Sequence, residues 1–310
     1  MIELKNVSKK YGDFKALDSV SFKIDKGQIV GFLGQNGAGK TTTMKIITGL
    51  IEPTEGEVLI NDEPMGKKNK TRIGYMPENT PLYNSLTVKE FINFMGELKE
   101  LKRADRKAAV SDLINKLNLE SVKNKLIKNL SKGYKQRVSM AGALIGNPEI
   151  LILDEPTVGL DPKQIIEIRN LIKSLSGGHT ILLSSHILTE INQICEKVII
   201  IDKGKIIAID TPDNLERNIS RNIINVVVED PDNNIKKVKE KLEGIKEITF
   251  VADINQKEKE YKVEIENDIE IRKDLISALS DLNITIIELK KAKSSLEEVF
   301  VNLVDEEGKE

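Results

Sequence analysis

The sequence predicts an α/β layered domain over residues 1–218, followed by a small α+β domain over residues 219–310. Three observations support this fold class. The first part contains short runs that are apolar throughout, as parallel strands buried on both faces are: QIVGFL, EILILD, TILLSS and KVIIID. Helical patterns separate these runs, as expected for a parallel sheet. The polar segment DNLERNISRN then ends the alternation, so a domain boundary is expected near residue 220.

Beyond this boundary the predicted elements follow the order strand, helix, strand, strand, helix, strand. The strands are INVVVED, KEITFVAD, YKVEIEN and ITIIELK, and helices are expected near residues 233–243 and 270–282. This order resembles that of a ferredoxin-like sandwich. The amphipathic run SLEEVFVNLV is expected to add a closing helix.

Composition indicates a chain that stays in water. No apolar run reaches the roughly 18 residues of a membrane span, and the opening MIELKNVSKK does not resemble a secretory signal. A cytoplasmic location is therefore expected. Cys195 lies in the helical pattern ILTEINQICEKV, where a small core residue is the expected role and a redox residue the alternative.

Charge is distributed unevenly along the chain. Residues 222–310 carry 14 Lys and Arg against 22 Asp and Glu, whereas residues 1–221 carry 33 against 27. The basic excess of the first part weakly favours an anionic partner, but a solvated basic surface is the simpler explanation. Nucleic acid is therefore not expected as a partner.

The segment GQNGAGKTT places Gly34, Gly39, Lys40 and Thr41 on the spacing G-x-x-x-x-G-K-[ST], between a predicted strand and a predicted helix. Glycines let successive backbone N–H groups point at phosphate oxygens, and the helix N-terminus favours negative charge. Lys40 can reach the β- and γ-phosphates, and the Thr41 hydroxyl can bind Mg²⁺. The alternative is a glycine-rich turn without a ligand. The nucleotide-binding residues expected here also include Asn36, Gly37, Ala38 and Thr42.

The strand EILILD ends in Asp154, and Glu155 follows directly. Ligands gather at the carboxyl ends of parallel strands, so Asp154 is expected to be a second Mg²⁺ ligand. Glu155, which points in another direction, is expected to polarise the water that attacks the γ-phosphate. The alternative is a solvated acidic strand end.

The run TILLSSH delivers His186 just past another strand end, where it could donate a hydrogen bond to the γ-phosphate. His186 is therefore expected to be catalytic. His179, in the loop SGGHT, is expected to be structural or exposed.

The segment LSKGYKQR places Ser131 at the start of a predicted helix and Gly133 in its first turn. Ser131 and the neighbouring N–H groups can face an anion, and Gly133 permits close approach. Helix capping alone explains Ser131, but it does not explain a glycine that costs about 0.5–1 kcal/mol relative to Ala. Both residues are therefore expected to bind a second γ-phosphate.

Together, Tyr11 in KKYGDFKALD and the segments GQNGAGKTT, YMPEN, LSKGYKQR, ILILDEP, GLDP and SSH resemble the motifs of an ABC transporter ATP-binding subunit. The resemblance covers residues 1–215 and implies a P-loop NTPase fold of the ABC ATPase type, with ATP and Mg²⁺ as ligands. The acidic α+β domain resembles the extension of ATPase subunits from bacterial ABC-2-type exporters.

The resemblance implies roles for two further residues. Tyr11 would stack on adenine, a contact that is indifferent to base identity, although a core aromatic at a strand end is the alternative. The segment GLDP matches the D-loop, so Asp161 would contribute to the contact between two ATPase subunits. Asp161 could equally cap the helix after Pro162, and the two roles are compatible.

Two positions depart from the common pattern of this family. Glu78 stands where the Q-loop usually carries glutamine; it can approach Mg²⁺ through oxygen, but it adds a charge and cannot donate a hydrogen bond. Glu78 is thus a tentative metal ligand, and an exposed loop residue is the alternative. In the signature, Lys132 and Tyr134 replace the glycine and glutamine of LSGGQ.

One P-loop and one signature per chain predict a homodimer, in which each signature completes the nucleotide site of the other chain. The resemblance implies an ATPase that powers an exporter and sits on the inner face of the membrane through polytopic permease subunits. A GTPase lacks support because N-K-x-D does not occur in the sequence, and about 90 residues between GKT and LSKG leave no room for a long coiled coil of the SMC type. A translation-factor ATPase usually has two such domains. A soluble regulator remains the alternative, and the transported substrate stays open.

Overall fold

The computed structural model describes residues 1–185, 187–215, 223–229, 235–245, 248–255, 260–265, 271–282 and 284–291. The chain divides into two compact units, Met1–Pro212 and Asp213–Glu310, which are described separately. The predicted boundary between residues 218 and 219 falls in a segment outside the described residues and stays a prediction.

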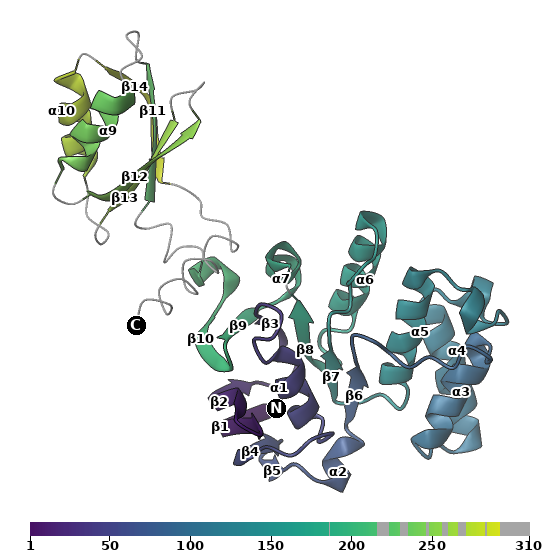
Figure 1. Ribbon diagram of the computed structural model, residues 1–310. Coiled ribbons are helices and arrows are strands. Elements are labelled where there is room, and N and C mark those ends of the chain that lie inside the picture. Colours follow the sequence, from purple (N-terminus) through teal and green to yellow (C-terminus); the bar gives the residue numbers. More distant parts are fainter. Residues whose placement is uncertain are drawn as a thin grey trace. The chain divides into compact units, whose positions relative to one another are not determined.

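The first unit contains a largely parallel sheet with the strand order β10-β9-β3-β8-β7-β6, in which β10 runs antiparallel to β9 (Figure 1). The apolar runs that predicted parallel strands form β3, β7, β8 and β9, and these strands are buried almost throughout. This part of the fold prediction is confirmed. The strand bounds are β3 Ile29–Leu33, β6 Ile73–Met76, β7 Ile150–Leu153, β8 Thr180–Ser185, β9 Lys197–Asp202 and β10 Lys205–Asp210.

A second, antiparallel sheet with the order β2-β1-β4-β5 was not predicted from the sequence. Its strands are β1 Ile2–Tyr11, β2 Phe14–Ile24, β4 Glu55–Ile60 and β5 Glu63–Pro64. Buried and exposed residues alternate over much of β2, as in a strand that covers the core with one face only. Register shifts interrupt the pairing of β1 with β2, which obscures the alternation in the sequence.

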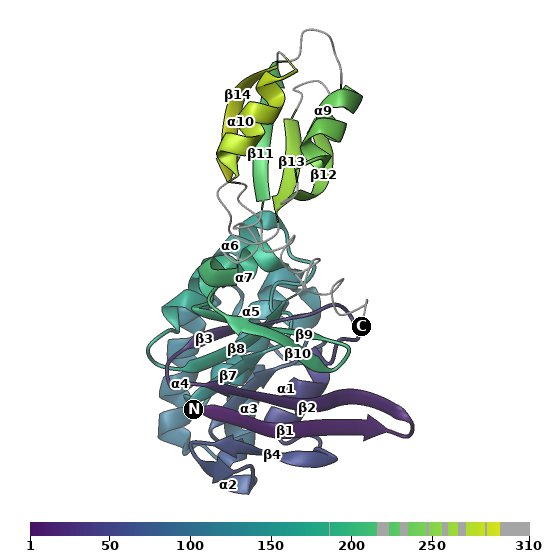
Figure 2. The same ribbon diagram turned by 90° about the vertical axis from the view of Figure 1, so that its left-hand side faces the viewer.

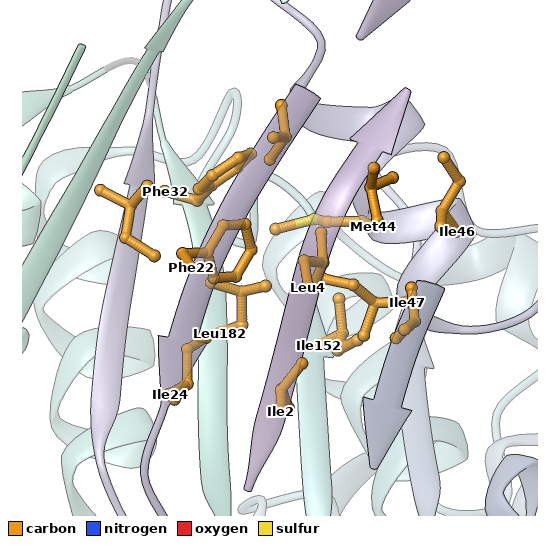
Figure 3. Close-up of a cluster of buried hydrophobic side chains, with 14 of the residues drawn as sticks. Ile2, Leu4, Phe22, Ile24, Phe32, Met44, Ile46, Ile47, Ile152 and Leu182 are labelled. Carbon is orange, nitrogen blue, oxygen red and sulfur yellow. The ribbon is translucent and has the colours of Figure 1, made fainter. Parts of the chain in front are cut away.

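Helix α1, Lys40–Ile47, lies between the two sheets. Figure 3 shows Met44, Ile46 and Ile47 of α1 packed with side chains from the antiparallel and the parallel strands. Phe22 of β2 and Phe32 of β3 add a tilted ring contact with centroids 5.7 Å apart. The two sheets and α1 therefore share one hydrophobic core.

The other helices surround this core. In both views α6 and α7 lie on the face of the parallel sheet that points away from the antiparallel sheet, while α3, α4 and α5 pack on one another (Figures 1 and 2). The helix bounds are α2 Lys67–Lys70, α3 Val88–Leu98, α4 Arg103–Lys116, α5 Lys132–Leu144, α6 Pro162–Ser174 and α7 Leu188–Ile194, with short 3₁₀ turns at Glu120–Val122 and Ile127–Asn129.

The second unit has the predicted order strand, helix, strand, strand, helix, strand. Its antiparallel sheet has the strand order β12-β13-β11-β14, which confirms the ferredoxin-like arrangement. The run SLEEVFVNLV, expected to form a closing helix, lies outside the described residues. The bounds are β11 Ile223–Glu229, α9 Ile235–Glu243, β12 Ile248–Asn255, β13 Glu260–Ile265, α10 Arg272–Ser280 and β14 Thr285–Lys291.

Wherever the structure describes the chain, its helices are too short or too polar to cross a membrane.

The shared core of the first unit predicts a stability effect. Leu182 is fully buried in this core, so Leu182→Ala is expected to lower the free energy of unfolding by about 2–5 kcal/mol. Urea unfolding followed by far-UV circular dichroism measures the change. Ile166→Ala, at a position that is 51% exposed, is the matched control. An equal effect of the two substitutions would contradict the central position of Leu182.

Candidate functional site

The loop between β3 and α1 has a backbone that depends on its glycines. Gly39 has φ +110°, which L side chains rarely adopt. A Cβ at Gly34 would lie 2.4 Å from the carbonyl oxygen of Ile201, so a larger residue would displace the loop from the end of β9. The sequence motif thus has a steric basis that is independent of any ligand.

Lys40 is buried at the first position of α1. Its Nζ donates a hydrogen bond to the carbonyl oxygen of Gly34 at 2.7 Å and lies 3.6 Å from Oε1 of Glu155. The ammonium group thus lies where the loop meets the end of β7.

A chain of hydrogen bonds links the helix start to the ends of β7 and β8. Thr41 Oγ1 donates to Asp154 Oδ2 at 3.0 Å, and Ser184 Oγ donates to Asp154 Oδ1 at 2.7 Å. The Glu155 amide in turn donates to Ser184 Oγ at 2.8 Å. Ser184 was not predicted from the sequence, because a serine within a strand gives no signal of such a link.

The paired oxygens of Thr41 and Asp154 fit a magnesium ion. Mg²⁺ prefers hard oxygen ligands and is usually held by one or two protein side chains together with substrate phosphates and water. Thr41 Oγ1 and Asp154 Oδ2 supply such a pair beside the glycine-rich loop, 3.0 Å apart.

Glu155 has an unusual backbone conformation. Its φ is +51°, in the left-handed region that non-glycine residues seldom adopt, and its side chain is buried. Such strain costs on the order of 1–3 kcal/mol and concentrates at functional sites. The two neighbouring carboxylates have different partners: that of Asp154 accepts hydrogen bonds from Thr41 and Ser184, and that of Glu155 lies 3.6 Å from Lys40 Nζ.

Two buried groups near the sheet have shifted acidities. Burial raises the pKa of the Tyr75 phenol well above its usual range, and the negative charge of Asp154 adds to this effect. Burial likewise raises the pKa of the Cys195 thiol, with a smaller contribution from Glu196. Cys195 is a buried free cysteine, as expected for a small core residue.

A cavity of about 550 Å³ brings most of the predicted nucleotide residues together. Tyr11, at the end of β1, lines it with a half-exposed ring, and Glu78 lines it from the exposed loop after β6. Phe14, Ala16, Gln35 and Val158 also line the cavity and were not predicted. The predicted residues that line it are Tyr11, Asn36, Gly37, Gly39, Lys40, Thr41, Thr42, Glu78 and Glu155.

The signature residues line a different cavity, of about 620 Å³, beside α5 and α6. Ser131 is the N-cap of α5, but its hydroxyl accepts no hydrogen bond from the described part of the helix. Gly133 is buried, and a Cβ there would lie 2.8 Å from the side chain of Gln164. The glycine thus has a packing role, while the exposed Ser131 hydroxyl can meet a ligand from outside.

The segment GLDP, which matches the D-loop, leads into and contacts α6. Asp161 Oδ1 accepts a hydrogen bond from the Gln164 amide at 2.9 Å, so the expected capping of α6 is observed. The Lys132 side chain lies against Gly159, where a Cβ would be 1.9 Å from Lys132 Nζ.

His186 lies outside the described residues, and its expected role stays a prediction. His179 is buried, with Nδ1 2.6 Å from the Pro148 carbonyl oxygen, in keeping with a structural role.

Comparison with known proteins decides the family. The family described as ABC transporter matches residues 17–158. An uncharacterized ABC transporter ATP-binding protein of Methanocaldococcus jannaschii is 41% identical over 205 residues, which cover 66% of this chain and 75% of that protein. This chain is an ABC transporter ATP-binding protein. It therefore has the ABC ATPase fold and binds and hydrolyses ATP.

Two relatives of this ATP-binding protein have more informative names. The linearmycin resistance ATP-binding protein LnrL of Bacillus subtilis is 31% identical over 310 residues, covering 98% of each chain. The lantibiotic transport ATP-binding protein SrtF of Streptococcus pyogenes is 36% identical over 228 residues, covering 72% of this chain and 98% of its own.

Solved ATP-binding cassettes share the fold of the first unit. A dimeric cassette in a post-hydrolysis state with ADP and Pi matches with a TM-score of 0.62 and 30% identity, covering 68% of this chain and 98% of its own. An ATP-binding subunit of another ABC transporter matches with a TM-score of 0.64 and 32% identity, covering 70% and 92%.

The hydrogen-bond chain predicts that Ser184 supports the Asp154 carboxylate and the Glu155 main chain. Ser184→Ala removes the acceptor of the buried Glu155 amide and a donor to Asp154, so a loss of about 1–3 kcal/mol in the free energy of unfolding is expected. Urea unfolding tests this. Ser174→Ala, an exposed serine whose hydroxyl donates to the Leu171 carbonyl, is expected to change stability by less than about 0.5 kcal/mol. Equal stability of the two variants would show that the hydrogen bonds of Ser184 do not contribute to the stability of the fold.

Proposed function

We propose that this protein is the Mg-ATP-driven ATPase subunit of an ABC-2-type exporter and that it works as a homodimer. The observation that carries the proposal is the separation of two half-sites: the glycine-rich loop and the Ser131 hydroxyl line different cavities of one chain. The start of α5, at Ser131, lies in a different cavity from the P-loop of its own chain. It can therefore bind the phosphate of a nucleotide that is held by a second chain. The dimeric form of a related cassette supports this arrangement.

Within one chain, each residue of the P-loop cavity has a proposed task. Tyr11 contacts the base, the loop amides of residues 34–42 bind the phosphates, and Lys40 neutralises their charge. Thr41 and Asp154 would hold a magnesium ion, which would withdraw charge from the phosphate oxygens. Glu78, an exposed residue, is proposed to approach the same ion from the loop after β6.

Glu155 is proposed to be the general base. Its buried carboxylate lies beside Lys40, the residue that would meet the γ-phosphate, so it can accept a proton from a water placed there. The Asp154 carboxylate, which is bonded to the Thr41 hydroxyl, is left for the metal. His186 is proposed to donate a hydrogen bond to the γ-phosphate.

The second chain would complete the site. Ser131 and Gly133 of one copy are proposed to face the γ-phosphate bound by the other, and Asp161 to lie at the contact between the copies. A two-fold arrangement gives two such sites. ATP carries the γ-phosphate that would contact both copies, and ADP lacks it. The closed dimer would therefore bind ATP more tightly than ADP, and this difference in affinity would drive the cycle.

The membrane partner is proposed to be a polytopic permease that contacts the loop at residues 78–85 and the neighbouring α3. Tyr83 is 51% exposed in this loop, and its ring makes an edge contact with Phe94 of α3 at 5.3 Å. The loop begins at Glu78, so movement at the nucleotide can reach this surface directly. The chain would then lie on the inner face of the membrane, and the printed names of LnrL and SrtF favour export.

Co-purification tests the transport function. The tagged full-length chain, expressed in its own cells and extracted with mild detergent, is expected to retain a polytopic membrane protein. Tyr83→Asp is expected to release that protein while ATP binding is unchanged. Recovery of the ATPase alone, with the chain fully in the non-membrane fraction, would favour a soluble regulator instead.

Nucleotide binding depends on Lys40 in this proposal. Lys40→Ala removes the charge next to the phosphates, so Mg-ATP binding is expected to fall below detection in calorimetric titration. Lys45→Ala, in the last turn of α1, is the control and should bind as the parent does. Unchanged affinity of Lys40→Ala would refute the assignment of the cavity.

Dimerisation depends on ATP that is bound but not hydrolysed. Glu155→Gln is expected to bind Mg-ATP, to lose most of its turnover and to accumulate as a dimer in light scattering. The double variant with Ser131→Asp should stay monomeric, because a carboxylate would face the partner's γ-phosphate. A monomeric Glu155→Gln protein in saturating Mg-ATP contradicts the dimer, and normal turnover removes Glu155 from the role of base.

A further inference from the structure

The β1–β2 hairpin ends in two aromatic side chains. Tyr11 and Phe14 are paired residues in the antiparallel register, on either side of the turn formed by Gly12 and Asp13. Residues that lie directly opposite each other in an antiparallel pair have their side chains on the same face. The two rings therefore belong to one face of the hairpin tip.

Both rings are unusually open to solvent. Phe14 is 65% exposed and Tyr11 is 51% exposed, although burial of an aromatic ring is strongly favourable. The Lys9 ammonium lies 5.3 Å from the centroid of the Tyr11 ring, so a cation already covers part of that residue. The Phe14 ring is the larger uncovered apolar surface at this tip.

The two rings line the same cavity as the glycine-rich loop. Tyr11, Phe14 and the small Ala16 of the hairpin line it together with Lys40 and Thr41 at the start of α1. A nucleotide with its phosphates on the loop would thus direct its base towards the hairpin. This step rests on the proposed function.

We propose that Phe14 is a second base-binding residue and that it forms, with Tyr11, a two-ring platform that selects purine over pyrimidine nucleotides. A bicyclic base can cover both rings, whereas a single-ring base covers one. Stacking on an aromatic side chain is largely indifferent to the groups on the edge of the base. The platform therefore distinguishes base size, and it accepts ATP and GTP alike.

The experiment compares nucleotides with a ligand that has no base. The full-length protein and its Phe14→Ala variant are titrated calorimetrically with ATP, GTP, CTP and inorganic tripolyphosphate in the presence of Mg²⁺. The variant is expected to bind ATP and GTP about tenfold more weakly, to change less for CTP, and to bind tripolyphosphate as before. Phe14→Tyr is expected to restore purine binding.

The matched control is Ile287→Ala, which removes an apolar side chain of nearly the same exposure, 64%, from β14 of the second unit. It should bind all four ligands as the parent does. Because Phe14 is mostly exposed, its replacement leaves the core intact, and circular dichroism verifies this.

Three results would overturn the inference: an unchanged affinity of Phe14→Ala for ATP, an equal loss for ATP and CTP, or an equal loss for tripolyphosphate. The last would mean that Phe14 shapes the phosphate loop and does not contact the base. These results are separable from failure of the proposed function, which would appear as unchanged ATP binding by Lys40→Ala.

Discussion

The hydrogen bonds that join Thr41 to Asp154 and Asp154 to Ser184 hold the catalytic end of this molecule together. They connect α1 with the carboxyl ends of β7 and β8, elements that are far apart in the sequence. The order β3-β8-β7 in the sheet makes this possible, because β8 lies between the strand that precedes the glycine-rich loop and the strand that ends at Asp154. Lys40 and Glu155 are the sequence neighbours of Thr41 and Asp154, so this link also positions them.

The antiparallel sheet packs against the helix that provides one end of the link, and it lines part of the site. It covers the face of α1 that the parallel sheet leaves open, so the helix that carries Lys40 and Thr41 is packed from both sides (Figure 3). The same sheet extends the β1–β2 hairpin to the mouth of the cavity. The antiparallel sheet therefore packs against the helix that carries the phosphate-binding residues, and the residues beside its β1–β2 turn line the proposed base site.

Much of this architecture could be predicted from local patterns. The strands buried on both faces have uninterrupted apolar runs, and the motifs that follow them have fixed spacing, so the parallel sheet, the glycine-rich loop and the acidic strand end were all recognisable. The order of elements in the second unit was also readable, because its strands and helices alternate with clear polar breaks.

The remainder depended on contacts between distant residues. The antiparallel sheet was missed because register shifts and charged residues disturb the alternation in β1. Gly133 was assigned to an anion alone, and its packing against Gln164, on another helix, has no local signature. Phe14 was overlooked because a strand aromatic is ordinarily a core residue, and only its 65% exposure beside Tyr11 shows otherwise. His186 and SLEEVFVNLV lie outside the described residues.

The left-handed backbone at Glu155 limits which residues the position can accept. Apart from glycine, Asn and Asp tolerate this conformation best, so either would relieve strain at φ +51°. Asp would also keep the charge, but its carboxylate would end one carbon closer to the main chain. Glu155 thus combines a strained backbone with a side chain that is one carbon longer, and its carboxylate reaches to within 3.6 Å of Lys40 Nζ.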